Sequence, residues 1–233
     1  MIAIAAAGVL VQSSYAQAHS ALPGALLAAY SFNEGSGVTA FDSAGDHDGG
    51  LEGGVTWTEA GRYGGAIDLD GTNDKVSVAD AAELDLTESF TIESWVAPDT
   101  GSKWRPVISK ATKFGGPETA GYALFSSGGE EDPEGYSANG SSFAAVGGSA
   151  SLELESWTHL ALSSDGETLR LYVEAEEVDS EPAVANSNTA AALEFGHVGG
   201  VLNSFFNGRI DEIRLYDEAL SAAQIETDRN SGV

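Results

Sequence analysis

The stretch NGRIDEIRLYDEAL, Asn207–Leu220, is the part of the chain that says most about its fold. Its isoleucines, Ile210 and Ile213, predict a long β-strand with an apolar face. Asp211 and Glu212 place two carboxylates inside that strand, where β-propensity disfavours them. Because side chains alternate along a strand, the pattern predicts that these two carboxylates point to opposite faces and do not serve one site.

The composition favours a single all-β protein. The chain has 233 residues, which fits one large all-β domain or two small ones. Its 29 glycines and 6 prolines predict many turns and short strands. It contains no cysteine, which excludes disulfides, thiolate metal sites and cysteine nucleophiles.

The net charge excludes several classes of partner. The chain carries 36 acidic and 10 basic residues, a formal charge of −26. A field of this sign repels nucleic acid and anionic membrane surfaces, so we expect neither nucleic-acid binding nor membrane insertion. The acidic residues form either a solvated shell suited to salty surroundings or an array of divalent-cation sites.

The first residues of the chain have the pattern of an export signal. Ile2–Val11 is an apolar run too short to span a bilayer. Tyr15–Ala18 reads YAQA and supplies a small-residue cleavage pattern. We therefore predict a signal peptide over residues 1–18, with its usual basic first segment missing, and a secreted protein. The alternative is a buried N-terminal strand or helix.

The remaining chain alternates short apolar runs with turn residues, as a two-sheet sandwich does. Asp165-Gly166, for example, is a strong hairpin signal. Only the tail looks helical, because Ser221 and Gln224 form a capping box. We predict strands over Ala25–Phe32, Gly65–Leu69, Lys75–Val78, Phe90–Val96, Val107–Ala111, Tyr122–Ser126, Phe143–Val146, Leu152–Leu154, Trp157–Leu162, Leu169–Val173, Ala192–Phe195 and Phe206–Tyr216.

Six blocks follow one another in the order LAAYSFNEGSG, AFDSAGDHDG, GGAIDLDGTNDKVSV, AELDLTESFTIESWVAP, ESWTHLALSSDGETLRLYVEAEEV and FFNGRIDEIRLYDEALSAAQI. This series resembles the laminin-G-like domains of the concanavalin A-like lectin/glucanase superfamily. The resemblance implies a two-sheet antiparallel jelly-roll sandwich with a short C-terminal helix, in which the last long strand pairs with the first. We expect residues 19–233 to form one such domain. Ser127–Ser149 matches no block and predicts a variable loop.

The same resemblance implies a structural calcium ion near the junction of the first and last strands. The motif positions in this chain are Asn33, Glu34, Asp42 and Asp211. Calcium takes six to eight oxygen ligands from carboxylates, amides and carbonyls. The alternative is that the loop residues are turn and capping residues and that Asp211 faces solvent. We interpret the acidic segment 46–48 as a polar turn.

One motif suggests catalysis. Residues 83–88, ELDLTE, have the ExDxxE form of retaining β-glucanases that share this architecture. Those enzymes place both carboxylates about 5 Å apart across the scissile bond. In this chain the hexapeptide precedes the predicted strand Phe90–Val96 instead of lying within it, so we do not expect it to be catalytic. Neither a serine elbow nor a phosphate-binding glycine loop occurs in the sequence.

Binding is therefore the favoured function. Carbohydrate-binding proteins stack sugars on aromatic rings and hold hydroxyls with polar side chains. Three tryptophans, Trp57, Trp95 and Trp157, have the pattern of core residues. The candidates for ligand contact are Trp104, Arg105, Tyr136, Asn139, Phe205 and Asn207. We expect a secreted, non-catalytic, calcium-stabilised lectin-like module that binds a polysaccharide or glycan. The alternatives are an adhesion domain that binds an extracellular protein and, less favoured, a glucanase-type enzyme.

Overall fold

The computed structural model describes residues 26–112, 114, 118–200 and 204–233, and the predicted signal peptide lies outside them. One sheet, sheet A, contains β1 (Leu26–Tyr30), β4 (Thr56–Thr58), β5 (Ala66–Asp70), β7 (Ser89–Pro98), β12 (Thr158–Asp165), β13 (Thr168–Val173), β14 (Glu176–Pro182) and β18 (Asn207–Tyr216). Sheet B contains β2 (Thr39–Ala40), β3 (Gly49–Glu52), β6 (Lys75–Val78), β8 (Arg105–Thr112), β9 (Ala120–Ser127), β10 (Glu134–Asn139), β11 (Phe143–Gly147) and β15 (Leu193–Phe195). Three further elements are the short strands β16 (His197–Val198) and β17 (Ser204–Phe205), which pair with each other, and the helix α1 (Ala222–Arg229).

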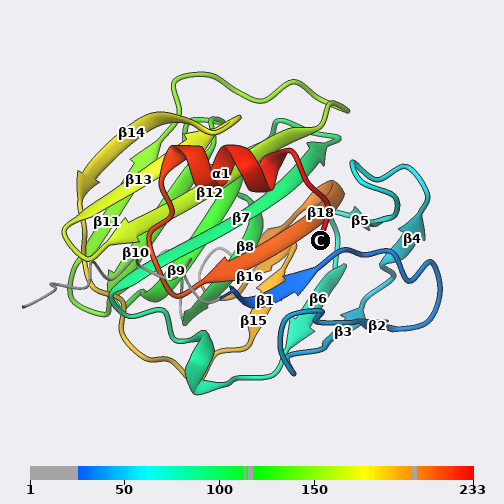
Figure 1. The fold of residues 1–233 in the computed structure, drawn as a ribbon, viewed down its shortest axis with the longest axis horizontal. Coiled ribbons are helices and arrows are strands. Elements are labelled where there is room, and N and C mark those ends of the chain that lie inside the picture. Colours follow the sequence, from blue (N-terminus) through cyan, green and yellow to red (C-terminus); the bar gives the residue numbers. More distant parts are fainter. Residues whose placement is uncertain (1–25, 113, 115–117, 201–203) are drawn as a thin grey trace, which may run out of the picture.

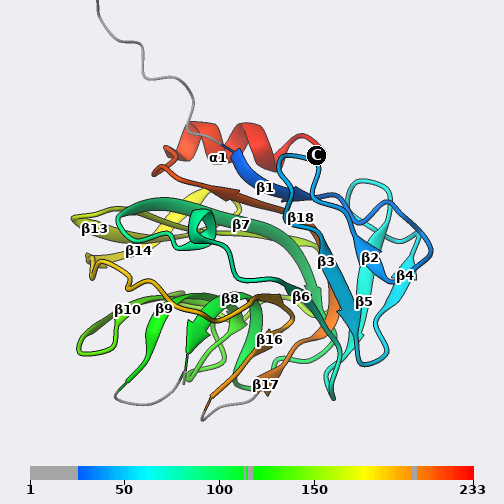
Figure 2. The same ribbon diagram turned by 90° about the horizontal axis from the view of Figure 1, so that it is seen from below.

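The two sheets stack face to face, and α1 lies on the outer side of sheet A (Figure 2). The order in sheet A is β14-β13-β12-β7-β18-β5-β4, with β1 also paired to β18. Sheet B runs β11-β10-β9-β8-β15-β6-β3-β2. The strand pairs in the described part of the chain are antiparallel, so the predicted two-sheet antiparallel sandwich with a short C-terminal helix is confirmed (Figure 1).

The predicted pairing of the first and last strands is also confirmed. Ala28 of β1 lies opposite Leu215 of β18, and Tyr30 lies opposite Ile213. Strand β18 is central in sheet A, because it also pairs with β7 and β5. The closing stretch of sequence therefore connects the start of the domain with its middle.

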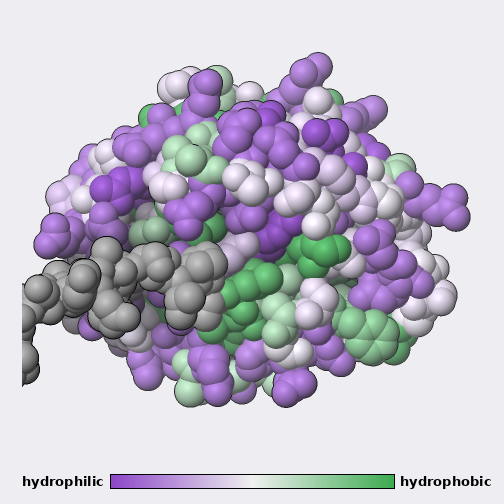
Figure 3. All heavy atoms as spheres, viewed as in Figure 1, coloured by the Kyte–Doolittle hydropathy of each residue, from purple (hydrophilic) through white to green (hydrophobic). Residues whose placement is uncertain are grey.

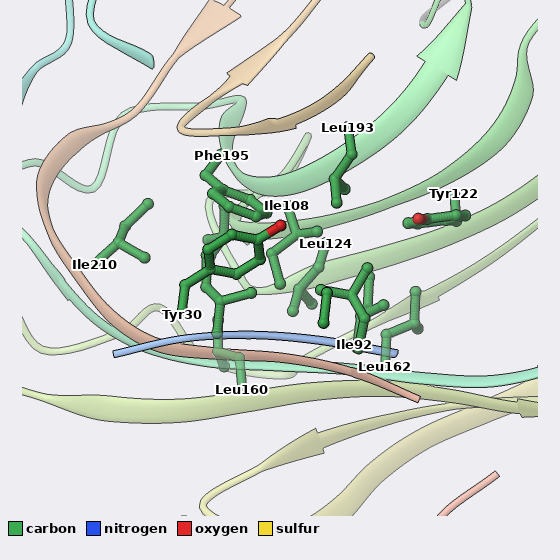
Figure 4. Close-up of a cluster of buried hydrophobic side chains, with 14 of the residues drawn as sticks. Tyr30, Ile92, Ile108, Tyr122, Leu124, Leu160, Leu162, Leu193, Phe195 and Ile210 are labelled. Carbon is green, nitrogen blue, oxygen red and sulfur yellow. The ribbon is translucent and has the colours of Figure 1, made fainter. Parts of the chain in front are cut away.

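The main core lies between the sheets and is built from alternate residues of their strands. In Figure 4, Tyr30, Phe195 and Ile108 converge from β1, β15 and β8. The rings of Tyr30 and Phe195 meet edge to face with centroids 4.8 Å apart. The Tyr30 hydroxyl donates a hydrogen bond to the carbonyl of His47, which satisfies the only polar atom of that side chain in the core.

Each sheet also has a smaller apolar cluster on its outer face. On β9, Tyr122 and Leu124 belong to the main core, whereas Ala123 and Phe125 belong to a separate cluster. Since neighbouring strand residues point to opposite faces, this second cluster lies on the outer face of sheet B. The corresponding cluster on sheet A includes Ile225, a fully buried residue of α1.

Two expectations about individual elements are wrong, and several strands, among them β3, β4 and β14, lie where no strand was predicted. Residues 152–154 are not a strand. The segment predicted as a variable loop contains β10, which pairs in register with β9 and β11. Strand β14 was not expected, because its residues are polar on both faces and mostly exposed at the edge of sheet A. An edge strand needs no apolar face to form its ladder, so hydrophobic alternation does not reveal it.

Hydrophilic residues cover most of the face that carries α1 (Figure 3). Within the described residues, no helix is long and apolar enough to cross a membrane.

Candidate functional site

The carboxylate of Asp211 is buried in sheet A and holds a loop in place. Its Oδ2 accepts hydrogen bonds from the backbone N–H of Arg62 at 2.7 Å and of Tyr63 at 3.0 Å. The residue is 0% exposed, so the alternative of a solvent-facing side chain is wrong. Burial raises the pKa of Asp211 to about 6, although these backbone donors oppose the rise.

Glu212 does not follow simple strand alternation. The ladder between β18 and β7 has an irregularity between Asp211 and Arg214, and Glu212 has φ 54°. Both carboxylates are fully buried, and Glu212 accepts a hydrogen bond from the N–H of Val233 at 2.5 Å. Burial raises the pKa of Glu212 to about 7, and the negative charge of Asp211 adds to the rise. The expectation from alternation fails here because a bulge adds a residue to one strand.

The other three predicted calcium ligands also accept bonds from the backbone. Asn33 accepts the N–H of Gly65 at 2.6 Å, and Glu34 accepts the N–H of Phe41 at 2.6 Å. Asp42 is 9% exposed, and its carboxylate organises the loop after β2 and the end of β1. Its three backbone donors are Ala29, Ala44 and His47.

These contacts are the turn and capping roles that formed the alternative to a calcium site. Among the residues that the structure describes, no three His, Asp or Glu side chains are grouped so as to hold a metal ion. Two buried carboxylate oxygens, Glu34 Oε2 and Asp211 Oδ1, nevertheless have no hydrogen-bond partner in the part of the chain that the structure describes. The calcium site stays a prediction.

The ExDxxE hexapeptide does not form a strand. Glu83 lies in a short 3₁₀ helix, Ala82–Leu84, and Glu88 lies in the loop before β7. Asp85 is bound by the ammonium of Lys110 at 2.8 Å. The segment lines a surface pocket of ≈ 260 Å³. The arrangement of two glutamates on one strand that glucanases use is therefore not formed by this motif.

Four of the six predicted ligand contacts come together on the outer face of sheet B. The rings of Trp104 and Tyr136 both pack against Phe125 of β9, with centroids 6.0 and 5.7 Å from it. Arg105 donates from Nη1 to the carbonyl of Phe205 at 2.7 Å, which joins β8 to β17. We call Trp104, Arg105, Tyr136 and Phe205 the Trp104 site.

The backbone at Trp104 is strained. Its φ of 60° lies in the left-handed region, which bulky residues rarely adopt. The residue is held there by a hydrogen bond from its N–H to the carbonyl of Gly128 and by close packing against Gly129. Such strain persists only where the surroundings enforce it, and it is concentrated at ligand-binding and active sites. Trp104 is half-buried, so part of the residue is accessible to solvent.

A row of polar side chains that the sequence did not reveal continues from Phe205. The Phe205 ring lies over His197 with centroids 4.4 Å apart, and His197 Nδ1 is 2.7 Å from a carboxylate oxygen of Glu194. The other oxygen of Glu194 accepts a hydrogen bond from Lys75 at 2.6 Å. Burial opposes ionisation of Glu194, but His197 and Lys75 together lower its pKa.

The two remaining candidates lie elsewhere. Asn139 accepts hydrogen bonds from the N–H groups of Ser141 and Ser142 in the turn after β10. Asn207 donates to the carbonyl of Asp70 at 3.2 Å beside the turn after β5. Both side chains stabilise turns outside the Trp104 site.

The three tryptophans expected in the core differ in their burial. Trp95 is 2% exposed but lies on the outer face of sheet A, where its ring contacts His159. Trp57 and Trp157 are half-buried. The guanidinium of Arg209 lies 5.4 Å from the Trp157 ring. Trp157 and Arg209 thus form a second tryptophan–arginine pair. Arg209 belongs to β18 of sheet A, so this pair is separate from the Trp104 site.

A buried polar cluster lies between sheet A and α1. Glu93 of β7 and His159 of β12 are both 0% exposed, and their side-chain oxygens and nitrogens have no hydrogen-bond partner within the described chain. Burial raises the pKa of Glu93 well above its usual range; the nearby charge of Asp228 adds to this and Arg214 opposes it. Burial, aided by Arg214, lowers the pKa of His159 to about 3, so this histidine is neutral near pH 7.

Solved structures with the same architecture include several binding domains. Domain 4 of an extracellular GH43 arabinanase from Geobacillus stearothermophilus, solved with arabinotriose, superposes with a TM-score of 0.71 at 23% identity, covering 88% of this chain and 98% of that one. The binding domain of Paraclostridial Mosquitocidal Protein 1 superposes with a TM-score of 0.68 at 15% identity, covering 87% of this chain and 51% of that one. The sialidase of Trypanosoma rangeli, solved with sialic acid, superposes with a TM-score of 0.62 at 16% identity, covering 87% of this chain and 32% of that one. At these identities the likeness shows the fold alone.

The comparison with curated protein sequences gave no significant match. A family model does match, over residues 70–226, which is most of the domain. That span contains β18, β7 and the whole Trp104 site. The chain belongs to the concanavalin A-like lectin/glucanases superfamily.

Proposed function

We propose that this protein is a secreted, non-catalytic carbohydrate-binding module whose ligand lies on the outer face of sheet B, at the Trp104 site. The observation that carries the proposal is the grouping of half-buried aromatic rings with hydrogen-bonding side chains there. Trp104, Tyr136 and Phe205 are each half-buried, and Arg105 follows Trp104 in the chain and donates a hydrogen bond to the carbonyl of Phe205. Sugar rings have apolar C–H faces that pack on aromatic rings, and their hydroxyls need polar partners.

The relatives support the proposal without deciding it. The arabinanase domain was solved with arabinotriose and the sialidase with sialic acid, and the arabinanase is described as extracellular. Another structure with this fold, a botulinum neurotoxin binding domain, was solved with the protein synaptotagmin II. Since one fold serves both kinds of ligand, the choice rests on the site. The mixed aromatic and polar character of the Trp104 site favours a glycan.

Calcium belongs to the proposal as a stabilising ion. The support is the family resemblance of the Asn33, Glu34, Asp42 and Asp211 positions, together with the two unpartnered oxygens on Glu34 and Asp211. A bound cation satisfies such oxygens, and it stabilises a protein when it binds only the folded state.

A glycan array in calcium-containing buffer tests the proposal. We expect binding to at least one class of glycan, and we expect Trp104→Ala to weaken it about tenfold or more, because the substitution removes most of the apolar contact. The matched control is Trp157→Ala, which removes a half-buried tryptophan beside an arginine on the other sheet and leaves binding unchanged. A blank array with folded wild-type protein would contradict glycan binding and favour a protein partner. Equal losses in the two variants would contradict the location.

A further inference from the structure

Arg105 has hydrogen-bonding capacity that no partner among the described residues uses. Its Nε and Nη2 donate to the hydroxyl of Ser102, and its Nη1 donates to the carbonyl of Phe205. These bonds account for three of the five N–H groups of a guanidinium. Two N–H groups therefore remain, one on each terminal nitrogen.

Arg105 has no ion-pair partner among the described residues, as is also true of Arg62, Lys103 and Arg209. Acidic residues nevertheless outnumber basic ones by 36 to 10. Burial alone, with no carboxylate contribution, accounts for the lowered pKa of Arg105. By contrast, carboxylates lie within ion-pair distance of Lys75, Lys110, Arg170, Arg214 and Arg229.

The surroundings fix the position of this charge. The bonds to Ser102 and to the main-chain carbonyl of Phe205 hold the guanidinium between the β7–β8 loop and β17. Trp104, which precedes Arg105 in the chain, and Phe205 are both half-buried. A partly desolvated cation is costly without a counter-ion, and a guanidinium binds a carboxylate through paired N–H groups better than it binds a neutral hydroxyl. A neutral sugar would leave that charge uncompensated.

We infer that the ligand of the Trp104 site is an acidic sugar, in which Arg105 binds the carboxylate while Trp104 and Phe205 pack against the sugar ring. This inference rests on the proposed carbohydrate-binding function and adds the chemical class of the ligand. Uronic acids and sialic acids both present a carboxylate on a ring that also has C–H faces. The distant acidic residues repel such a ligand, but salt near 150 mM screens charges more than about 8 Å away.

Calorimetric titration at about 150 mM NaCl tests the inference with paired sugars. The uronic arm compares trigalacturonic acid with its methyl ester, which keeps the shape and removes the charge. The sialic arm compares sialyllactose with lactose. We expect the acid to bind roughly 10- to 100-fold more tightly than its neutral counterpart in at least one arm, as one charge-assisted contact provides. The arm that shows the preference identifies the source of the carboxylate.

Two variants assign the preference to Arg105. Arg105→Gln should abolish the preference for the acid and retain affinity for the neutral sugar. Lys103→Gln removes an exposed cation two residues away and should change the ratio by less than about threefold, because exposed charges are screened. Thermal unfolding checks that each variant is folded, and the wild-type comparison of acid with neutral sugar needs no variant.

The outcomes separate the two claims. Equal affinity of wild type for acid and neutral forms in both arms overturns the acidic-ligand inference and leaves carbohydrate binding intact. An unchanged preference in folded Arg105→Gln overturns the role of Arg105. No binding of any of the four sugars, together with a blank glycan array, overturns the proposed function itself.

Discussion

At the residue scale, Asp211 is the carboxylate whose role in the fold is most sharply defined. Its oxygen caps two backbone N–H groups, those of Arg62 and Tyr63, from inside sheet A. Asp211→Ala leaves both donors without a partner, and we expect it to lower the free energy of unfolding by about 1–3 kcal/mol. Asp211→Asn keeps an acceptor oxygen at the same place and should cost clearly less. Urea unfolding in EDTA measures both.

Calcium makes the same pair of variants informative in a second way. If the ion binds at Asp211, adding calcium raises the melting temperature of wild type and raises that of Asp211→Asn by less, because a ligand charge is lost. A melting temperature that calcium and EDTA leave unchanged in wild type would contradict the calcium site. Equal destabilisation by alanine and asparagine in EDTA would contradict the capping role.

Sequence patterns located the Trp104 site only in part. Trp104, Arg105 and Phe205 could be proposed because they lie in or beside loops, where an aromatic or basic residue has no evident place in a core. Glu194 and Lys75 could not be added to this site from the sequence. These two residues are 119 positions apart in the chain, and the pairing of β15 with β6 brings them together. Hydrophobic alternation within a strand contains no information about which strands become neighbours.

At the element scale, α1 covers two fully buried titratable side chains, Glu93 and His159. Because the folded pKa of Glu93 is raised, the folded state holds its proton more tightly than the unfolded chain does. The stability that this provides is complete below about pH 4.3 and is lost as the pH rises through the folded pKa. Glu212 contributes to stability in the same way, and this contribution is lost as the pH rises through its folded pKa of about 7. His159 acts in the opposite direction, because its folded pKa of about 3 lies below the value of about 6.5 in the unfolded chain. Its contribution to stability therefore rises with pH between these two values and is constant above about 6.5.

We therefore expect the melting temperature to fall as the pH is raised from about 6.5 to about 8, above the pKa of an unfolded histidine. Glu93→Gln, which stays neutral and keeps its size, should make this fall shallower. Salt near 1 M reduces the Debye length to about 3 Å, so scans at that concentration remove the contribution of distant surface charges. A slope that is the same for wild type and Glu93→Gln at high salt would contradict this account of the cluster under α1.

Elements with apolar faces were predictable, and others were not. The capping box at Ser221 and Gln224 predicted α1 correctly, with Gln224 Oε1 accepting the N–H of Ser221 at 3.0 Å. Strand β14 escaped prediction because it is polar on both faces, and β10 because glycine and serine interrupt its apolar pattern. The bulge at Glu212 could not be predicted either, because a prediction from alternation assumes a regular strand.

At the scale of the whole molecule, the charge of −26 must be accommodated by the folded state. Self-repulsion destabilises a compact acidic chain at low ionic strength, and salt screens it. We expect the melting temperature at neutral pH to rise by several degrees between about 0.01 M and about 1 M NaCl. A melting temperature that stays constant over this range would contradict a destabilising acidic surface.

The architecture of the sandwich follows from the sequence more fully than its ligand does. The ordered blocks and the closing strand were sufficient to predict two antiparallel sheets and the pairing of β1 with β18, which the structure confirms. The ligand was less accessible, because the same sandwich presents two outer faces. In this chain α1 covers the outer face of sheet A, and the Trp104 site lies on that of sheet B.

Indole N–H signals in a ¹H–¹⁵N spectrum test the location of the ligand most directly, because the chain has only 4 tryptophans. The signals are assigned with single Trp→Phe variants, and arabinotriose and trigalacturonic acid serve as a neutral and an acidic probe. We predict that the Trp104 signal shifts when sugar is added, and that it shifts at lower concentrations of the acidic sugar than of the neutral one. The signals of Trp57, Trp95 and Trp157 should stay in place. A Trp104 signal that neither sugar moves, or a shift confined to Trp57 or Trp157, would contradict binding on the outer face of sheet B.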